Sequence, residues 1–408
     1  MSTAHTEAET PQGLTWADKR NLIVLAGGQA LFISAASMLI AIGGLVGQAL
    51  ATDKSLATLP VSSYVIGMAL GTVPASLMMR RIGRRAGFQL GTLVGFGGAL
   101  VCSLAVYLSN FWLLAFGTLF VGMFGATAQL YRFAAADGVP EWFRGKAISL
   151  VLAGGVVAGF IGPQIAKVTR TLFTGTEFLG AYLAASGLFI ISMLLLSFLR
   201  IPPPAPQTVA GSGRPLAEII AQPRFLVAVL SSMIGYGTMT LLMTATPLAM
   251  VAHPYPFNDA ATVIQWHVVG MFLPGFFTGS LIARYGVYRV IFTGVVLDLL
   301  CVAIALSGDS FYHYWAALVL LGVGWNFMFV GGSTLLTSTH TDTERAKTQA
   351  TAEFCTFGTQ AVASLSSGSL LFYLGWHRVL WTGLPMLVIV GISVVALSLH
   401  ERRVRATA

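Results

Sequence analysis

The segment GMALGTVPASLMMRRIG, residues Gly67–Gly83, decides the fold because it returns later in the chain as GMFLPGFFTGSLIARYG, residues Gly270–Gly286. Five of the seventeen positions are identical at a constant offset of 203 residues. A second pair, Glu141-x-x-Arg144-Gly-Lys146 and Asp342-x-x-Arg345-Ala-Lys347, repeats at an offset of 201. Such an internal repeat predicts two structurally equivalent halves.

The composition indicates whether these halves lie in water or in a membrane. Only 9% of the 408 residues are charged and 56% are hydrophobic, and the mean hydropathy is +0.79. A soluble domain carries about 25% charged residues. The chain has too few charges to cover a soluble surface, so it is an integral membrane protein. The same figures exclude a disordered, collagen-like or disulfide-rich secreted chain.

Long stretches without Asp, Glu, Lys or Arg mark the membrane spans, since a helix needs roughly 20 apolar residues to cross a bilayer. One stretch is long enough for two spans, divided at Ser109-Asn110, and another is interrupted only by Asp298. We expect an all-α fold of twelve transmembrane helices, in the windows 21–52, 55–79, 86–131 (two spans), 147–166, 178–199, 225–258, 260–283, 287–308, 310–343, 354–377 and 379–400.

The basic residues orient these spans. With a cytoplasmic N-terminus, eighteen of the 23 lysines and arginines fall on the cytoplasmic side, and Arg132 alone lies inside a span. Only four fall outside: Lys54, Lys167, Arg170 and Arg378. This asymmetry places both termini in the cytoplasm. The net charge of +8 therefore faces the inner leaflet, and we expect no nucleic-acid partner.

A proline-rich segment separates the six spans of the first half from the six spans of the second half. Residues 201–221 contain four prolines between 202 and 206 and two glycines at 211 and 213, which disfavour a helix. We expect a cytoplasmic tail at 1–20, a six-helix bundle at 21–200, an interdomain linker at 201–221, a second bundle at 222–400 and a cytoplasmic tail at 401–408. The tail at 1–20 lacks the basic start and cleavage site of a signal peptide.

The loop after Gly67 carries a family resemblance. Residues Ser76–Arg85 read SLMMRRIGRR, and Gly279–Gly286 read GSLIARYG. Both resemble the loop signature G-x-L-x-D-R-x-G-R-R of the major facilitator superfamily, although Arg80 and Ala283 replace its acidic residue. The stretch from Asp137 to Ala147 is also similar to a loop of that family. The resemblance implies two parallel six-helix bundles, a monomeric carrier, and gating loops that contain Arg81, Gly83, Arg84, Arg85, Asp137, Arg144, Arg284, Gly286 and Arg345.

The span at 147–166 resembles the family's glycine-proline motif, which is best known from antiporters. Its residues Gly159, Gly162 and Pro163 match that motif loosely. Glycine and proline together favour a bend, whereas glycine alone also permits close helix packing. An exporter and a simple packing role both remain open.

Two ionisable residues stand about two turns inside spans, near the cytoplasmic side. Charged groups are costly there, so each is a functional hypothesis. By the resemblance Arg132 lies near the central pathway, although snorkelling to the headgroups would also explain it. Glu353 lies at a similar depth. We expect either an interdomain ion pair with Arg132 that closes the inner gate, a proton-carrying role for Glu353, or a static buried pair.

Asp298 and His267 are the other two candidates. Asp298 is central in its span, where burial disfavours the charged form of a carboxyl. It is either a proton carrier or, because the family's ninth helix is peripheral, the partner in a structural hydrogen bond. His267 either titrates near neutral pH or serves packing.

Uncharged polar residues complete the expected pathway. They fall on the spans that line the cavity in the family: Gln29, Gln129, Tyr131, Trp325 and Asn326. Aromatic, amide and hydroxyl groups are typical of a small-molecule site and also of helix–helix hydrogen bonds. Cys102, Cys301 and Cys355 lie in apolar spans without a CxxC pair, so we expect no metal, no disulfide and no cofactor.

These features predict a secondary transporter of the bacterial inner membrane that works by alternating access, with protons as the coupling ion. No P-loop for ATP is present. Efflux of an amphiphilic or drug-like compound is one direction, and Arg132 motivates the alternative, uptake of a small anionic metabolite. A polytopic enzyme is a distant alternative, since the sequence lacks HExxH and GxSxG motifs. A channel is another, which the two-half repeat disfavours.

Overall fold

The computed structural model describes residues 13–140, 143–201, 213–341 and 343–407, and these form helices with no strand among them. The predicted all-α fold is confirmed. In chain order the helices are α1 (Trp16–Leu50), the short 3₁₀ helix η1 (Lys54–Leu56), α2 (Leu59–Ile82), α3 (Arg84–Tyr107), α4 (Phe111–Ala128), α5 (Tyr131–Asp137), α6 (Arg144–Thr169), α7 (Leu179–Leu196), α8 (Leu216–Ile220), α9 (Pro223–Ala252), α10 (Phe257–Phe272), α11 (Gly275–Tyr285), α12 (Val287–Ser307), α13 (Phe311–Thr337), α14 (Arg345–Leu374) and α15 (Trp376–Thr407).

Some predicted features lie outside the described residues. They are Glu141 and Asp342 of the second repeat, residues 1–12 of the N-terminal tail and residues 202–212 of the linker.

Within the described chain, eleven segments are long and apolar enough to cross a membrane when α10 and α11 are counted as one bent span. Ten are long and apolar enough to cross a membrane as single helices or straight pairs, and α10 with α11 makes an eleventh that bends by 43°. Helix α14 is a 30-residue helix rich in threonine and serine that packs on α9 as α6 packs on α1, and it stands at the place of the remaining predicted span. Two spans are interrupted: α4 stops at Ala128 and α5 starts at Tyr131, and α10 and α11 are separated at Leu273-Pro274.

Helix α15 extends into the predicted cytoplasmic tail at 401–408. The helix continues to Thr407 without a break after the span. Glu401 explains part of this continuation, because its carboxylate accepts hydrogen bonds from Arg224 Nε at 2.6 Å and from the Tyr288 hydroxyl at 2.7 Å. The start of α1 is similarly fixed by a capping box between Thr15 and Asp18, so the first helix begins before residue 21.

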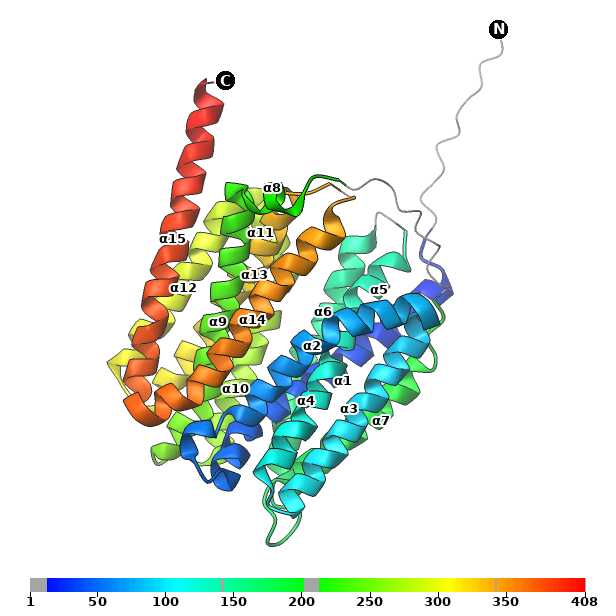
Figure 1. The fold of residues 1–408 in the computed structure, drawn as a ribbon, viewed down its shortest axis with the longest axis vertical. Helices are drawn as coiled ribbons and strands as arrows, with labels where there is room; N and C mark the ends of the chain where they lie inside the picture. Colours follow the sequence, from blue (N-terminus) through cyan, green and yellow to red (C-terminus); the bar gives the residue numbers. More distant parts are fainter. Residues whose placement is uncertain (1–12, 141–142, 202–212, 342, 408) are drawn as a thin grey trace.

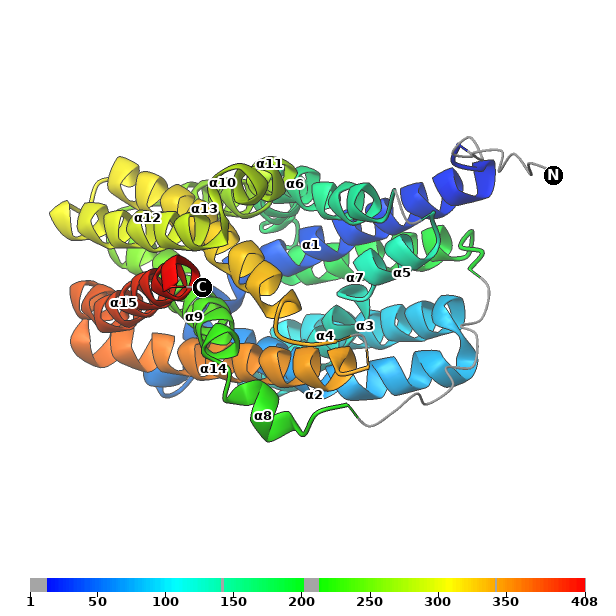
Figure 2. The ribbon, with the colours of Figure 1, turned by 90° about the horizontal axis from the view of Figure 1, so that it is seen from above.

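The two halves repeat the same packing order. In the first half α1 packs on α6, α2 on α4, and α3 on α4 and α7. In the second half α9 packs on α14, α10 on α13, and α12 on α13 and α15. Seen from above, the two sets of helices stand beside one another, with α2 of the first half against α14 of the second (Figure 2). Each half also has its own apolar core.

The repeated glycines explain why the two halves pack alike. Gly83 and Gly286 end matching helices with φ of +83° and +87°, a conformation that favours glycine. Gly67 lets α2 meet the backbone of α4, since a methyl group there would overlap the Leu119 carbonyl oxygen. Its counterpart Gly270 would place a methyl group 2.9 Å from the Val319 carbonyl oxygen of α13. The predicted duplication therefore has a counterpart in backbone geometry.

The halves are joined on the side opposite the termini (Figure 1). The hydroxyls of Ser62 on α2 and Ser364 on α14 lie 2.9 Å apart, and Thr58 Oγ1 donates to the Ser364 carbonyl at 3.2 Å. On the other flank Gln164 of α6 donates to Gln265 of α10 at 2.8 Å. By the charge asymmetry this is the outer side, so we call these contacts the outer seal.

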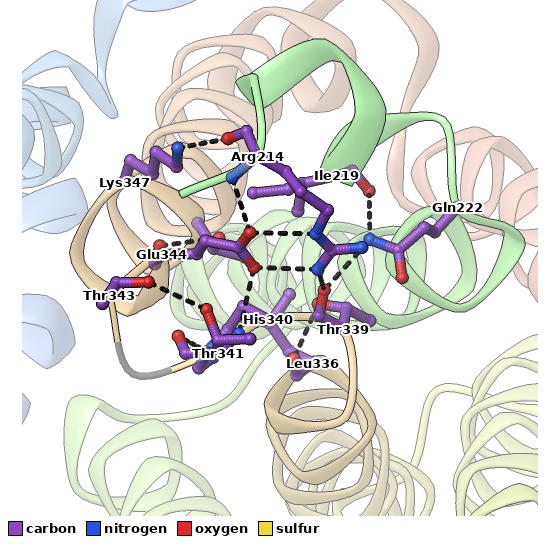
Figure 3. A network of polar contacts seen from close by, with 11 residues as sticks. Arg214, Ile219, Gln222, Leu336, Thr339, His340, Thr341, Thr343, Glu344 and Lys347 are labelled. Carbon is purple, nitrogen blue, oxygen red and sulfur yellow. Dashed lines mark hydrogen bonds and ion pairs between the residues drawn. The ribbon is translucent and has the colours of Figure 1, made fainter. Parts of the chain in front are cut away.

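The described end of the linker is fastened to the loop between α13 and α14 (Figure 3). Glu344 Oε1 accepts hydrogen bonds from the backbone N–H and Nε of Arg214, at 2.8 and 2.9 Å, and Oε2 accepts one from Nη2 at 2.8 Å. The Thr341 backbone N–H donates to Oε2 at 3.0 Å. These donors, Arg214 above all, hold the pKa of Glu344 well below its ordinary value. We call this pair the linker clasp.

Candidate functional site

A cavity lies between the two halves and consists of two adjoining parts. The deep chamber has a volume of about 320 Å³ and is lined by residues of both halves, from Gln29 and Tyr64 in the first to Tyr236 and Trp325 in the second. The vestibule has a volume of about 410 Å³ and extends to Arg345 at the start of α14. Gln129, Arg132, Tyr236 and Phe329 line both parts. Because the outer seal is closed and the vestibule reaches the cytoplasmic helix ends, the protein faces inward.

One wall of the cavity is aromatic and belongs to the second half. Trp325 and Phe329 of α13 stack with ring centres 5.2 Å apart at 14°. Tyr236 of α9 meets the edge or face of both at 5.1 Å and of Phe357 at 6.2 Å. These four residues form the aromatic cluster. Together with the methionines Met239, Met243 and Met271 they give a surface suited to a flat apolar ring.

Three glutamines from different parts of the chain line the deep chamber. They are Gln29 on α1, Gln129 at the break between α4 and α5, and Gln360 on α14. Within the described chain Gln360 Oε1 is buried without a hydrogen-bond partner. A carboxamide offers a donor and an acceptor side by side, so these residues can fix the orientation of a polar ligand.

Arg132 lines the cavity from the first turn of α5, just after the break in span four. The Leu130 N–H bonds to the Thr127 carbonyl at 3.1 Å, which tightens the chain between α4 and α5. The Arg132 guanidinium carbon then lies 4.8 Å from the centre of the Phe133 ring. Arg132 lines both the deep chamber and the vestibule, and so brings a positive charge to the cavity.

Glu353 of α14 lines the vestibule together with Arg132. The salt bridges between described residues do not include a pair of these two. The structure thus brings the two candidates to one cavity from opposite halves without joining them. A pair that forms when the inner side closes stays a prediction.

Asp298 does not line this cavity. It is fully buried between α12 and α13, and in the described part of the chain neither carboxylate oxygen has a hydrogen-bond partner. The structural hydrogen bond considered for it is therefore absent there. A methyl group on Gly324 of α13 would overlap Oδ1 of Asp298, so the carboxyl fills the space that this glycine leaves.

At the corresponding helix crossing in the first half, the small residue and the large residue are on the opposite helices. Gly95 on α3 corresponds to Asp298 at the offset of 203, and a methyl group there would lie 2.8 Å from Cβ of Phe124. Phe124 on α4 corresponds to Gly324 on α13 at an offset of 200, which is the offset between the starts of these two helices at Phe111 and Phe311. The small and the large residue have exchanged helices between the two halves, which favours a packing role for Asp298.

His267, Tyr131 and Asn326 have structural contacts. His267 is buried, and its Nδ1 lies 2.7 Å from the Leu318 carbonyl oxygen of α13. Tyr131 is buried against Phe88, with ring centres 4.8 Å apart. Asn326 lines the deep chamber, but its Nδ2 donates to the Met271 carbonyl at 2.7 Å and its Oδ1 accepts from Thr278 at 2.7 Å. Asn326 therefore braces the bend between α10 and α11.

The predicted gating residues lie at the cytoplasmic helix ends. Arg84 at the start of α3 forms an ion pair with Asp137 at the end of α5, inside the first half. Arg345 lines the vestibule. The Arg284 guanidinium lies 5.3 Å from the ring centre of Tyr285. The side chains of Arg81, Arg85 and Arg144 are exposed.

The glycines of α6 serve close packing on both sides of the helix. A methyl group on Gly162 would overlap the Ser37 hydroxyl and the Ser34 carbonyl oxygen of α1, and one on Gly159 would lie 3.2 Å from Val268 and Val269 of α10. Helix α6 is continuous from Arg144 to Thr169 with Pro163 inside it. These contacts account for the glycines without reference to the direction of transport.

Several residues of the cavity and of the linker clasp were not predicted from the sequence. Tyr236, Phe329, Phe357 and Gln360 line the deep chamber, and Arg214 with Glu344 forms the linker clasp. A signal was present for Tyr236, which stands between Gly235 and Gly237 on a span expected to line the cavity. Phe329 and Phe357 gave none, because aromatic residues are spread over all spans.

Comparison with known proteins gives a consistent result. The family profile described as Major Facilitator Superfamily matches residues 25–264 and 257–408. A protein of Brucella anthropi named riboflavin transporter RfnT is 41% identical over 93% of this chain and 96% of its own length. An uncharacterized MFS-type transporter of Bacillus subtilis, YddS, is 27% identical over 84% of this chain and 83% of its own length.

Among solved structures the crystal structure of the nucleoside transporter NupG is similar in fold. It has a TM-score of 0.74 with 14% identity, and the match covers 92% of this chain and 99% of that one. At this identity the likeness concerns the fold alone.

Proposed function

Since the chain belongs to the major facilitator superfamily, we propose that its cargo is riboflavin or another compound with the flavin ring system. The chain is a multi-pass transport protein of the bacterial inner membrane, not an enzyme. The identity of its cargo is the step beyond the family. A relative that is named a riboflavin transporter and is 41% identical over most of both chains supports this choice.

The single observation that carries the proposal is the aromatic cluster in the deep chamber. A flavin is a flat tricyclic ring with one apolar edge, one polar edge and a polyol chain. The stacked pair Trp325 and Phe329, with Tyr236 across them, suits such a ring, since offset-stacked and edge-to-face arrangements of aromatic rings are favourable. Gln29 and Gln129, from the opposite half, supply polar groups for the polyol chain of the flavin.

Arg132 supports the uptake of an oxygen-rich or anionic compound. Its charge lies at the cavity, where a neutral hydroxyl chain or an anionic group could each accept its hydrogen bonds. Efflux of an amphiphilic or drug-like compound is the second candidate, and the mainly apolar wall of the deep chamber favours it. The α6 glycines, which pack on α1 and α10, favour neither direction.

Proton coupling through Glu353 completes the proposal. Glu353 is the carboxylate that lines the vestibule opposite Arg132, so protonation there would change the attraction between the two halves. Asp298 lies outside the cavity and is the less suitable carrier. Alternating access would then open the outer seal when the inner side closes.

The test measures flavin binding and flavin transport separately. Riboflavin fluorescence is titrated with the purified protein, and labelled riboflavin counterflow is followed in proteoliposomes. We expect saturable binding and counterflow. Absence of both for riboflavin and its ring analogues, with a folded protein, would overturn the proposal. If riboflavin accumulates in inside-out vesicles and not in right-side-out vesicles, the direction of transport is efflux from the cell and not uptake.

A further inference from the structure

Two buried polar atoms at the aromatic cluster lack partners in the part of the chain that the structure describes. They are Nε1 of Trp325 and Oε1 of Gln360. Trp325 is 4% exposed and Gln360 is 8% exposed. Buried polar groups in proteins are nearly always hydrogen-bonded, and an unpaired one has a free-energy cost. One atom is a donor and the other an acceptor, so a single ligand edge with both functions could satisfy them.

Both residues belong to the wall that would hold a flat ring. Trp325 stacks on Phe329 and meets Tyr236. Gln360 follows Phe357 by three residues on α14, which places both on one face of that helix, and Phe357 contacts Tyr236 in turn. Trp325 and Gln360 both line the deep chamber. Both side chains therefore belong to the cavity wall that a ring against this cluster would touch.

Stacking alone does not orient a flavin, since both of its outer rings are flat. The two ends differ at their edges: one carries two methyl groups, and the other carries an N–H between two carbonyls. The second is an imide, with one donor flanked by acceptors. Its donor matches Gln360 Oε1, and either of its carbonyls matches the Trp325 N–H.

We propose that Trp325 and Gln360 determine specificity by reading the imide edge of the flavin ring. The ring N3–H donates to Gln360 Oε1, and an adjacent carbonyl accepts from Trp325 Nε1. The polyol chain then extends toward Gln29, Gln129 and Arg132 of the first half. This inference rests on the proposed flavin cargo, and it adds which end of the ring enters the second half.

The experiment compares riboflavin with N3-methylriboflavin, which has no imide donor. Binding is measured by flavin fluorescence with the unaltered protein, Gln360→Ala and Trp325→Phe. The alanine removes the acceptor and leaves room for the methyl group, and the phenylalanine keeps a ring but removes the indole N–H. Trp266→Phe is the matched control, because Trp266 lies outside the deep chamber and contacts Phe160 and Trp315.

We expect the unaltered protein to bind riboflavin about tenfold more tightly than the N3-methyl compound, the effect of one neutral hydrogen bond. Gln360→Ala should weaken the binding of riboflavin by a similar factor. The ratio of the affinities for the two flavins should then be close to one. Trp325→Phe should weaken the binding of both flavins by about five- to tenfold and leave the ratio of their affinities unchanged. Trp266→Phe should change neither affinity.

Equal affinity of the unaltered protein for both flavins would overturn the inference and leave the flavin cargo standing. If Gln360→Ala still prefers riboflavin to the N3-methyl compound by the same factor, the inference is also overturned and the flavin cargo is left standing. No binding of any flavin by the unaltered protein would overturn the cargo itself, and the inference with it. Each variant is first compared with the unaltered protein in thermal unfolding, so that misfolding is not mistaken for lost recognition.

Discussion

The hydroxyl oxygens of Ser62 and Ser364 lie 2.9 Å apart, although 302 residues separate them in the sequence. Ser62 belongs to α2 of the first half and Ser364 to α14 of the second. Their contact holds the outer side closed while the cavity is open to the cytoplasm. In alternating access it must break once in each cycle.

A disulfide at this point should stop transport. In the double variant Ser62→Cys, Ser364→Cys the sulfur atoms replace hydroxyls that already touch, so we expect an oxidised crosslink. Counterflow should fall to background after oxidation and return with a thiol reductant. Each single variant serves as the control and should keep its activity after oxidation. Full counterflow by the crosslinked protein would contradict the assignment of these residues to the outer seal.

Tyr236 should contribute strongly to substrate affinity, because it contacts three other rings of the aromatic cluster. Tyr236→Leu should weaken flavin binding about tenfold or more, measured by fluorescence titration. Tyr312→Leu is the matched control, since Tyr312 is 76% exposed on the outer part of α13. An unchanged affinity in Tyr236→Leu would place the substrate elsewhere in the cavity.

Glu353→Gln should uncouple transport from the proton gradient. The amide keeps the size of the side chain but cannot take up a proton, so substrate counterflow should persist while accumulation driven by a pH gradient is lost. Asp298→Asn is the comparison, and we expect it to keep gradient-driven accumulation because Asp298 lies between α12 and α13. Retention of coupling in Glu353→Gln, with loss in Asp298→Asn, would reverse the two roles.

Gly122→Ala should destabilise the first half severely. A methyl group there would overlap the Tyr64 carbonyl oxygen, which is backbone and cannot rotate away. We expect a loss of about 3 kcal/mol or more, seen as a lower melting temperature or as failure to purify. Gly97→Ala on α3 is the control, since no atom lies within 4 Å of the added methyl group. Equal stability of both variants would refute the close crossing of α2 and α4.

The linker clasp should make stability depend on pH in one direction. The pKa of Glu344 is lowered in the folded protein, mainly by hydrogen bonds from Arg214. Its contribution is therefore complete above the unfolded value of about 4.3 and decreases as the pH falls toward the lower folded value. Glu344→Gln should lower the melting temperature at neutral pH, and the difference should shrink below about pH 4.

Glu218→Gln is the control for the clasp, because Glu218 is exposed on the neighbouring helix α8. It should leave the melting temperature nearly unchanged. A deficit of Glu344→Gln that stays constant as the pH falls would contradict the ionised clasp.

The sequence predicted the spans, their orientation and the duplication, because these depend on composition and on glycine spacing. It did not predict the breaks at Gln129-Leu130 and Leu273-Pro274 within otherwise apolar spans. At the second break Pro274 was visible in the sequence, but the bond from Asn326 to the Met271 carbonyl connects helices that are distant in the chain. No local pattern encodes it.

Asp298 and Glu353 show why the site was harder to predict than the fold. Each is a single carboxylate in a largely uncharged helix, and depth in the membrane is similar evidence of function for both. Only the packing distinguishes them, since Glu353 faces the vestibule and Asp298 faces Gly324. Helices that are apolar on all sides give no periodic signal that says which face is turned to the cavity.

The exchange of bulk between Gly95–Phe124 and Asp298–Gly324 has a consequence for how the halves have diverged. At this crossing the pair of side chains, rather than either residue, is the unit that must be preserved. A substitution on one helix requires a compensating substitution on the other, so the halves can differ at every one of these positions and still pack alike. At this crossing we therefore expect covariation between the third and fourth spans within each half, rather than identity between the halves.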